Sequence, residues 1–97
     1  MNIIEFLEAR IAEDEADNRD YAKLEDDDRG GWAIVYSQRV LAECATKRSI
    51  LADRKRIDRS ANPDDWSAGY SDGNYDALHA LAAVYKDHPD YQQEWAA

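Results

Sequence analysis

Apolar residues recur at helical spacing along most of the chain, and the clearest example is the stretch from residue 32 to residue 57. At about 100° per residue, its apolar side chains fall on one broad face: Trp32, Ala33, Tyr36, Val40, Cys44, Ile50, Leu51 and Ile57. Ser37, Ala45 and Arg48 lie off that face, and the stretch has neither Gly nor Pro. One long helix is predicted, spanning about 40 Å at a rise of about 1.5 Å per residue. This is long for so small a domain, so one end is expected to overhang or to pair with a partner.

A second amphipathic pattern opens the chain and predicts a helix over residues 3–23. Asn2 is suited to cap it, with Glu5 as the reciprocal capping partner. One face collects the apolar residues, with two polar ones in its middle: Ile3, Ile4, Leu7, Ile11, Tyr21 and Ala22, with Asp14 and Asn18. Phe6 points away from this face, so we expect it to be exposed or to mark a third-helix contact or a dimer seam.

Two polar breaks separate the helical patterns. The first, residues 25–31, reads EDDDRGG and predicts a turn. A short connection between two long helices implies that they are antiparallel neighbours. The second, residues 60–74, contains Pro63 and two glycines and is expected to be a loop. Its aromatic residues, Trp66 and Tyr70, are interpreted either as a lid over the core or as a binding surface.

The rest of the chain predicts a shorter helix over residues 74–86, started by Asn74 or Asp72, and a last helical turn over residues 90–95. Leu78, Leu81, Ala82 and Tyr85 form the apolar face of this helix, Pro89 follows its end, and Tyr91 and Trp95 are expected to pack together. The predicted fold is therefore all-α. A hairpin of residues 3–23 and 32–58 is closed by the third helix, as in a three-helix bundle, and residues 1–97 form one domain.

Three charged residues, Glu43, Lys47 and Arg54, interrupt the apolar face of the long helix. Charged side chains are rarely buried unless they are paired. Glu43 and Lys47 are spaced i, i+4, which favours a pair at the edge of the core, and the alternative is a polar patch that binds something. In the hairpin, Arg10 is expected to reach Glu43, and Asp14 is expected to reach Lys47.

Charge is distributed unevenly over the 97 residues, whose net charge is −9. Residues 1–28 have a net charge of −8, residues 29–59 of +5 and residues 60–97 of −6. The acidic flanks are expected to lie near the basic middle, where each exposed pair contributes under about 1 kcal/mol. The overall acidity argues against direct nucleic-acid binding, which depends on basic groups that neutralise phosphate. A basic protein partner stays open.

Few residues offer recognisable chemistry. Cys44 is the single cysteine, so no internal disulfide is expected, and its place on the core face predicts a buried thiol. His79 and His88 could approach each other near Asp87 or Asp90 to bind a metal, but a structural role for His88 in the DHPDY turn is favoured. No phosphate loop and no nucleophile signature is present, so neither an enzyme nor a cofactor is expected. No apolar run reaches membrane-spanning length and no signal-peptide pattern opens the chain, which predicts a cytoplasmic protein without a membrane partner.

Three segments carry a family resemblance. They are EFLEARIAEDEADNR at residues 5–19, RVLAECATKRSIL at residues 39–51 and LHALAAVYKDHPDYQQEW at residues 78–95. The chain resembles a family of small uncharacterised proteins from actinobacteria and their phages, in which the corresponding patterns are FLRARLDEDE, RVLAEVEAKRRI and LRLLALPYADHPDYREEW. The resemblance implies an origin but no reaction. Many members carry Cys and His at zinc-like spacing, whereas residues 52–77 here contain neither, so a zinc site does not carry over.

The function expected from the sequence is a non-enzymatic protein-binding module, an acidic modulator of a host protein if the gene belongs to a phage. Self-association as a homodimer is an alternative use of the overhanging helix. Other candidates are an acidic DNA mimic and a small metal-dependent enzyme using His79 and His88. The residues expected to form an interaction surface or polar network are Arg10, Asp14, Glu43, Lys47, Arg54, Trp66, Tyr70 and His88.

Overall fold

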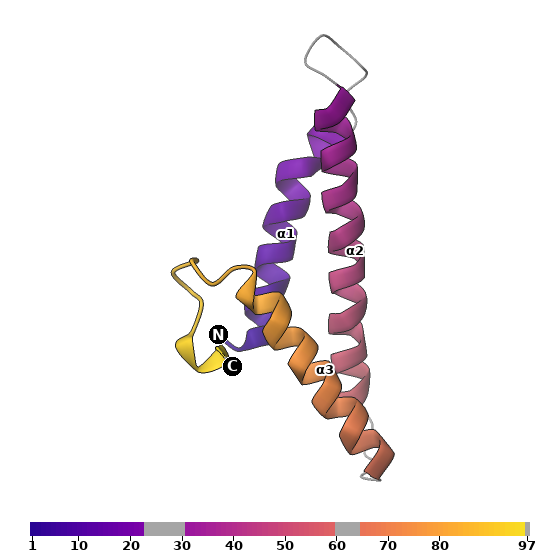
Figure 1. The fold of residues 1–97 in the computed structure, drawn as a ribbon, viewed down its shortest axis with the longest axis vertical. Coiled ribbons are helices and arrows are strands. Elements are labelled where there is room, and N and C mark those ends of the chain that lie inside the picture. The colour runs from indigo at the N-terminus through magenta and orange to yellow at the C-terminus, as the bar shows by residue number, and fades with distance from the viewer. Residues whose placement is uncertain (23–30, 60–64, 97) are drawn as a thin grey trace.

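An antiparallel helical hairpin crossed by a third helix forms the fold. The computed structural model describes residues 1–22, 31–59 and 65–96, in which the elements are α1 (Ile3–Ala22), α2 (Gly31–Arg59), α3 (Asp65–Ala83) and the 3₁₀ turn η1 (Gln93–Trp95). α1 and α2 lie side by side, α3 crosses the lower half of this pair, and the two ends of the chain lie close together (Figure 1). The predicted all-α arrangement of three helices is confirmed.

The molecule is elongated, with principal dimensions of 56 × 26 × 18 Å. Its radius of gyration is 16.4 Å, whereas a compact domain of this length would have about 12.5 Å. α2 is the reason: its 29 residues extend for about 43 Å. Figure 1 shows that the start of α2 projects beyond α3 and lies beside α1 alone. The predicted overhang is therefore present, and the core is confined to the half of the hairpin that α3 covers.

The start of α1 is closed by the predicted capping box. The backbone N–H of Glu5 donates to Oδ1 of Asn2 at 2.8 Å, and the N–H of Asn2 donates to Oε1 of Glu5 at 3.2 Å. These two bonds satisfy donors that the first helical turn would otherwise leave unpaired.

The core gathers residues from all four elements. Its buried members are Ile3, Phe6, Leu7, Ile11, Cys44, Leu51, Leu78, Ala82 and Trp95. Most of them lie on the predicted faces. Phe6 is not exposed but fully buried, and of its predicted alternatives the contact with the third helical segment is present, through the ring of Tyr85. α1 has two buried faces: one contacts α2, and the other, which contains Phe6, contacts the C-terminal segment.

The apolar face of α2 is buried only where a second layer reaches it. Trp32 and Tyr36 were expected in the core, yet both are exposed, whereas Ser37, expected off the face, is buried. Trp32 and Tyr36 are exposed because α3 does not extend to this end of α2 (Figure 1). Helical periodicity identifies an apolar stripe but not the length over which a neighbour covers it.

α3 begins about ten residues earlier than the sequence predicts, so residues 65–74 are helix and not loop. Asn74 therefore does not cap the helix; its side-chain amide donates to the backbone carbonyl of Ile50 on α2 at 3.1 Å. Gly69 and Gly73, which suggested a loop, lie on exposed positions with no atom near the place of a missing Cβ. Tertiary contacts with α2 offset the weak helix propensity of these glycines. The predicted loop at residues 60–64 and most of the turn at residues 25–31 lie outside the described residues.

None of the helices in the described ranges is both long and apolar enough to span a lipid bilayer.

Candidate functional site

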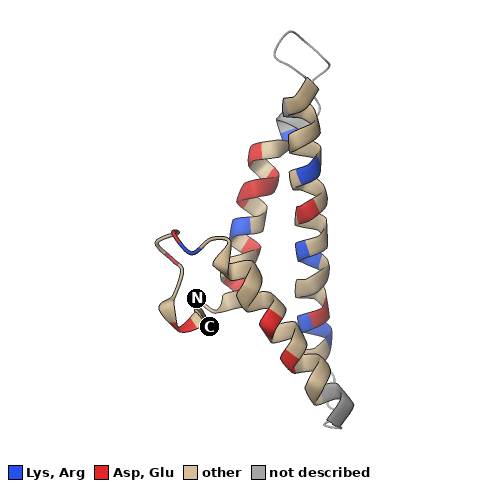
Figure 2. Ribbon diagram, in the orientation of Figure 1, with Lys and Arg blue, Asp and Glu red and all other residues tan. Residues whose placement is uncertain are grey.

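Opposite charges on α1 and α2 face each other across the hairpin, as the charge distribution predicts (Figure 2). Lys55 pairs with Glu8 at 2.5 Å. Arg48 binds Glu15 with two hydrogen bonds, from Nε at 2.8 Å and from Nη2 at 2.5 Å. The hydrogen bonds from Arg48 lower the pKa of the Glu15 carboxyl. These ion pairs favour one register of the hairpin but add little to its stability, because they lie at the surface.

A tyrosine joins the two charged residues that were expected to meet across the hairpin. The hydroxyl of Tyr85 donates to Oδ2 of Asp14 at 2.7 Å and accepts from Nζ of Lys47 at 3.1 Å. The predicted approach of Asp14 and Lys47 is thus made through Tyr85, which the sequence assigned only to the apolar face of the third helix. A phenolic hydroxyl in a core usually has a hydrogen-bond partner, and this was the available signal. Burial and the bond to Asp14 raise the pKa of Tyr85, so it is unsuited to act as a base near neutral pH.

Replacing Tyr85 with Phe should destabilise the protein by about 1–2 kcal/mol near pH 8, since a hydrogen bond to a carboxylate is lost. The pKa of Tyr85 is raised in the folded state, so its contribution is complete below the unfolded value of about 10 and falls as pH rises above it. The limiting slope is about 1.4 kcal/mol per pH unit. Urea midpoints measured from pH 8 to pH 11 should therefore converge for the two proteins. A stability difference that stays constant over this range would contradict the assignment.

Arg10 and His88 connect α1 to the C-terminal segment. Nη1 of Arg10 lies 2.7 Å from Nδ1 of His88, and Nη2 donates to Glu13 at 3.0 Å. The N–H of Asp90 donates to Nδ1 of His88 at 3.0 Å, which holds the DHPDY turn as predicted. Among the described residues, the ion pairs of Arg10 are with Glu13 and Asp90, so its predicted pairing with Glu43 is wrong. The reason is that the C-terminal segment returns to the side of α1 where Arg10 lies.

Of the other residues predicted for the interaction surface or polar network, one is buried and two are exposed. Arg54 is buried and binds Asp58 and Ser71. Glu43 is exposed, and in the described part of the chain it forms no ion pair with Lys47. Tyr70 is also exposed, on helix α3 and not on a loop, and its hydroxyl accepts from Arg56 at 3.3 Å. The side chain of Trp66 lies outside the described residues, so its interpretation as lid or binding surface stays a prediction.

Cys44 behaves as a core residue. Its thiol lies 4.0 Å from the carbonyl oxygen of Ile11, and burial raises its pKa. A thiol with a raised pKa holds little reactive thiolate. Nor do His, Cys, Asp and Glu side chains in the described ranges gather in groups of three that would suit a metal ion. His79 and His88 have different surroundings: His88 contacts Arg10, and His79 lines a pocket next to α3.

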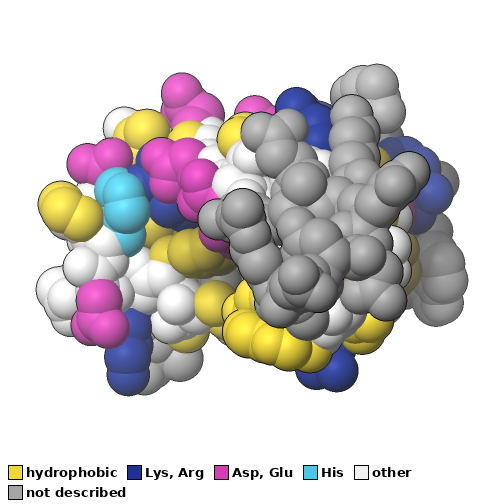
Figure 3. Space-filling view, turned by 90° about the horizontal axis from the view of Figure 1, so that it is seen from above, with side chains coloured by type: hydrophobic (Ala, Val, Ile, Leu, Met, Phe, Trp, Pro, Cys, Tyr) yellow, Lys and Arg dark blue, Asp and Glu magenta, His cyan; other side chains and the backbone are white. Residues whose placement is uncertain are grey.

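The projecting end of α2 carries an apolar surface, here called the α2 patch, formed by Trp32, Val35 and Tyr36. Their exposed fractions are 74%, 60% and 57%. Seen from this end of the molecule, hydrophobic side chains border the residues that are not described (Figure 3). Trp32 and Tyr36 are one helical turn apart, and Val35 lies beside them, so the three side chains share one side of α2. The α2 patch is the candidate interaction site of this chain.

Comparison with known proteins agrees with the resemblance seen in the sequence. The model of a family described as "Family of unknown function (DUF6221)" matches residues 1–97. Searches of curated proteins and of solved structures returned no match. The protein is therefore a member of the DUF6221 family, a family of unknown function.

Proposed function

We propose that the protein is a non-enzymatic protein-binding module that contacts its partner through the α2 patch. The observation that carries this proposal is the exposure of Trp32, Val35 and Tyr36 on one side of a helix end that α3 does not cover. Trp and Tyr are enriched among the residues that contribute most to binding at protein interfaces. An amphipathic helix commonly docks its apolar side into a hydrophobic groove of a partner, with anchors at spacings of three and four residues.

The net charge of the chain indicates the surface charge of the partner that we propose. The ion pairs between α1 and α2 are neutral in sum, so the net charge of −9 is left uncompensated. The partner we propose is a protein with an apolar groove bordered by basic residues, to which an acidic module is steered by long-range attraction. If the gene is carried by a phage, this partner would be a protein of the host.

Mimicry of nucleic acid receives less support. A phosphate mimic needs a row of free carboxylates, whereas Glu8 and Glu15 are bound to cations of α2 and Asp14 accepts a hydrogen bond from Tyr85. These three carboxylates are therefore paired within the protein and are not free to contact a partner.

The proposal predicts that the Trp32→Ser, Tyr36→Ser double variant folds normally but loses its partner. Both side chains are exposed, so the free energy of unfolding should change by no more than about 0.5 kcal/mol, while affinity should fall by more than about tenfold. Partners captured by the tagged wild type from a lysate of the encoding organism or its host would be identified by mass spectrometry, purified, and titrated against both proteins.

Val84→Ser is the matched control, because Val84 is equally exposed but lies after α3, away from the α2 patch. It should bind the purified partner as the wild type does. Sedimentation of the protein alone would show whether the α2 patch instead joins two copies of the chain. Equal affinity of the double variant and the wild type would refute the α2 patch as the binding surface.

A further inference from the structure

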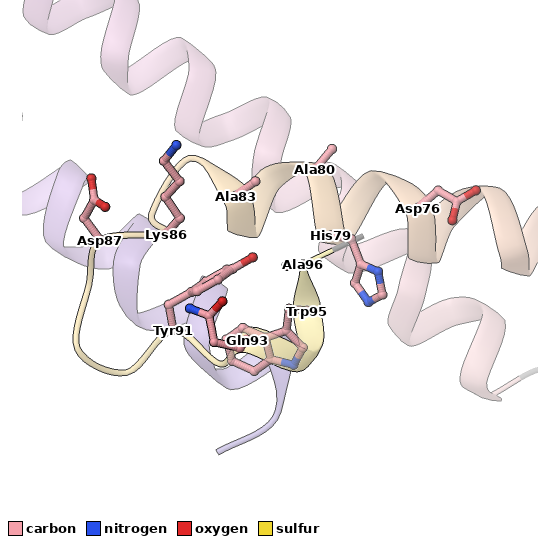
Figure 4. Close-up of a pocket in the computed structure, with 10 residues that line it drawn as sticks. All are labelled: Asp76, His79, Ala80, Ala83, Lys86, Asp87, Tyr91, Gln93, Trp95 and Ala96. Atoms are coloured by element: carbon pink, nitrogen blue, oxygen red, sulfur yellow. The ribbon is translucent and has the colours of Figure 1, made fainter.

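We infer that the contact between His88 and Arg10 is a pH-sensitive latch, which holds residues 84–96 on α1 at neutral pH and releases them when the imidazole takes up a proton. These residues are the C-terminal segment, which turns at His88 and brings Tyr91 and Trp95 back next to α3 (Figure 4). The latch lies apart from the α2 patch, so it does not rest on the proposed function.

Two hydrogen-bond donors converge on the ring of His88. Nη1 of Arg10 lies 2.7 Å from Nδ1, and the backbone N–H of Asp90 donates to the same ring nitrogen at 3.0 Å. Nη1 also contacts Nε2. A guanidinium and a backbone N–H can donate but cannot accept, whereas an imidazolium carries a proton on both nitrogens. The contact therefore requires the neutral ring and is lost as pH falls.

Arg10 is held where a charged ring would repel it. Its side chain is only 8% exposed, and its guanidinium lies over the ring of Phe6, 5.4 Å from the centroid. Nη2 is bound to Glu13 at 3.0 Å. Protonation of His88 would place a second cation beside this guanidinium, where little water is present to weaken the repulsion between the two charges.

Two carboxylates lie near the pair and offset only part of this repulsion. Oδ2 of Asp90 is 3.9 Å from Nη1 of Arg10 and 4.0 Å from Nδ1 of His88. The side chains of Asp90 and Glu13 are both more than half exposed, so water screens their attraction for a charged ring. Uptake of the proton thus removes both acceptor contacts in exchange for a weak, screened attraction.

The other contacts of the segment decide which part is released. The hydroxyl of Tyr85 is bound to Asp14, and burial raises the pKa of Tyr85, so this contact persists in mild acid. Beyond the turn, the rings of Tyr91 and Trp95 pack on Phe6 with centroids 6.1 Å and 5.0 Å away. Release therefore begins after Tyr85 and exposes aromatic side chains that are covered at neutral pH.

Hydrogen exchange followed by NMR at pH 7.5 and pH 5.5 tests the latch, because histidine titrates in this range and carboxyl groups ordinarily titrate below it. The reporters are the backbone N–H groups of Tyr91 and Trp95, which donate to the carbonyls of His88 and Gln92 at 3.0 Å. After correction for the intrinsic effect of pH on exchange, their protection should fall by about threefold to tenfold, as uptake of one proton allows. Protection of the Cys44 amide on α2 should change by less than about twofold, since the opening is local.

His88→Asn removes the titration but keeps an acceptor, because the amide oxygen of asparagine can replace Nδ1. Its Tyr91 and Trp95 amides should keep the wild-type protection of pH 7.5 at both pH values. His79→Asn is the matched control, since His79 lies on α3 beside the pocket of Figure 4 and should leave the acid response intact.

Arg10→Met is the second variant, which removes the repelling cation and should reduce the acid response to less than about twofold even if the segment is held less firmly. The latch is overturned if the protection of Tyr91 and Trp95 in the wild type is the same at both pH values, or if Cys44 loses protection equally. It is also overturned if His88→Asn or Arg10→Met responds to acid as the wild type does.

Discussion

Phe6→Ala should lower the free energy of unfolding by about 3–5 kcal/mol, the largest loss we expect from a single substitution here. The Phe6 side chain is fully buried where α1, α3 and the C-terminal segment meet. Its ring contacts four others, those of Tyr85, His88, Tyr91 and Trp95. The guanidinium of Arg10 also lies over it, 5.4 Å from the ring centroid. Removing the ring would leave a cavity bounded by side chains of three segments, which cannot collapse together.

Urea denaturation followed by far-UV circular dichroism measures this loss. Because Trp95 packs on Phe6, near-ultraviolet signals of the aromatic cluster should weaken as well. Tyr36→Ala is the control, since it removes an exposed aromatic ring and should change stability by no more than about 0.5 kcal/mol. A cost below about 1 kcal/mol for Phe6→Ala would show that the C-terminal segment does not pack on α1 as described.

Arg54→Ala is expected to cost about 2–4 kcal/mol, although arginine is usually a surface residue. Its side chain is only 3% exposed. It donates to Asp58 at 2.8 Å and to the hydroxyl of Ser71 at 3.1 Å, and its guanidinium lies 4.0 Å from the centre of the Tyr75 ring. One side chain therefore joins α2 to α3 through packing, hydrogen bonds and a cation–π contact. The substitution removes all three and leaves space between the helices.

Arg56→Ala is the matched control, two residues along the same helix. The Arg56 side chain is 64% exposed and pairs with Asp53 at the surface, so its loss should cost under about 1 kcal/mol. Asp58→Asn tests the role of charge, because it leaves the buried guanidinium without its countercharge and should cost about 1.5–3 kcal/mol. Equal stabilities of the Arg54 and Arg56 variants in thermal and urea unfolding would contradict the burial of Arg54.

Several features of the fold follow from local chemistry and were predictable. The capping box of Asn2 and Glu5 needs only two side chains at the right spacing, and the structure confirms it. The antiparallel hairpin follows from two long helical patterns joined by a short turn. The burial of Leu7 and Cys44 follows from their place on the apolar faces, and the turn at His88 follows from the proline beside it.

The partners of the buried and half-buried polar residues could not be predicted from local spacing alone. Asp14, Lys47 and Arg54 were singled out because charges inside an apolar stripe need partners, and each has one. Two of the partners lie tens of residues away along the chain: Tyr85 follows the end of α3 and Ser71 lies on α3, whereas Asp58, the other partner of Arg54, is four residues along α2. Helical spacing relates residues three and four apart, so it cannot show which side chain of another helix arrives at a given position.

The sequence by itself determined the class of fold, the order of the helices, the cap of α1 and most of the core, because periodicity, spacing and charge are properties of neighbouring residues. Only the tertiary structure decided that Phe6 is buried, that α3 begins at Asp65 and that Trp32 and Tyr36 are exposed. The physical reason is the same in each case. Burial depends on which second surface covers a helix face, and α3 covers one half of the hairpin but not the start of α2.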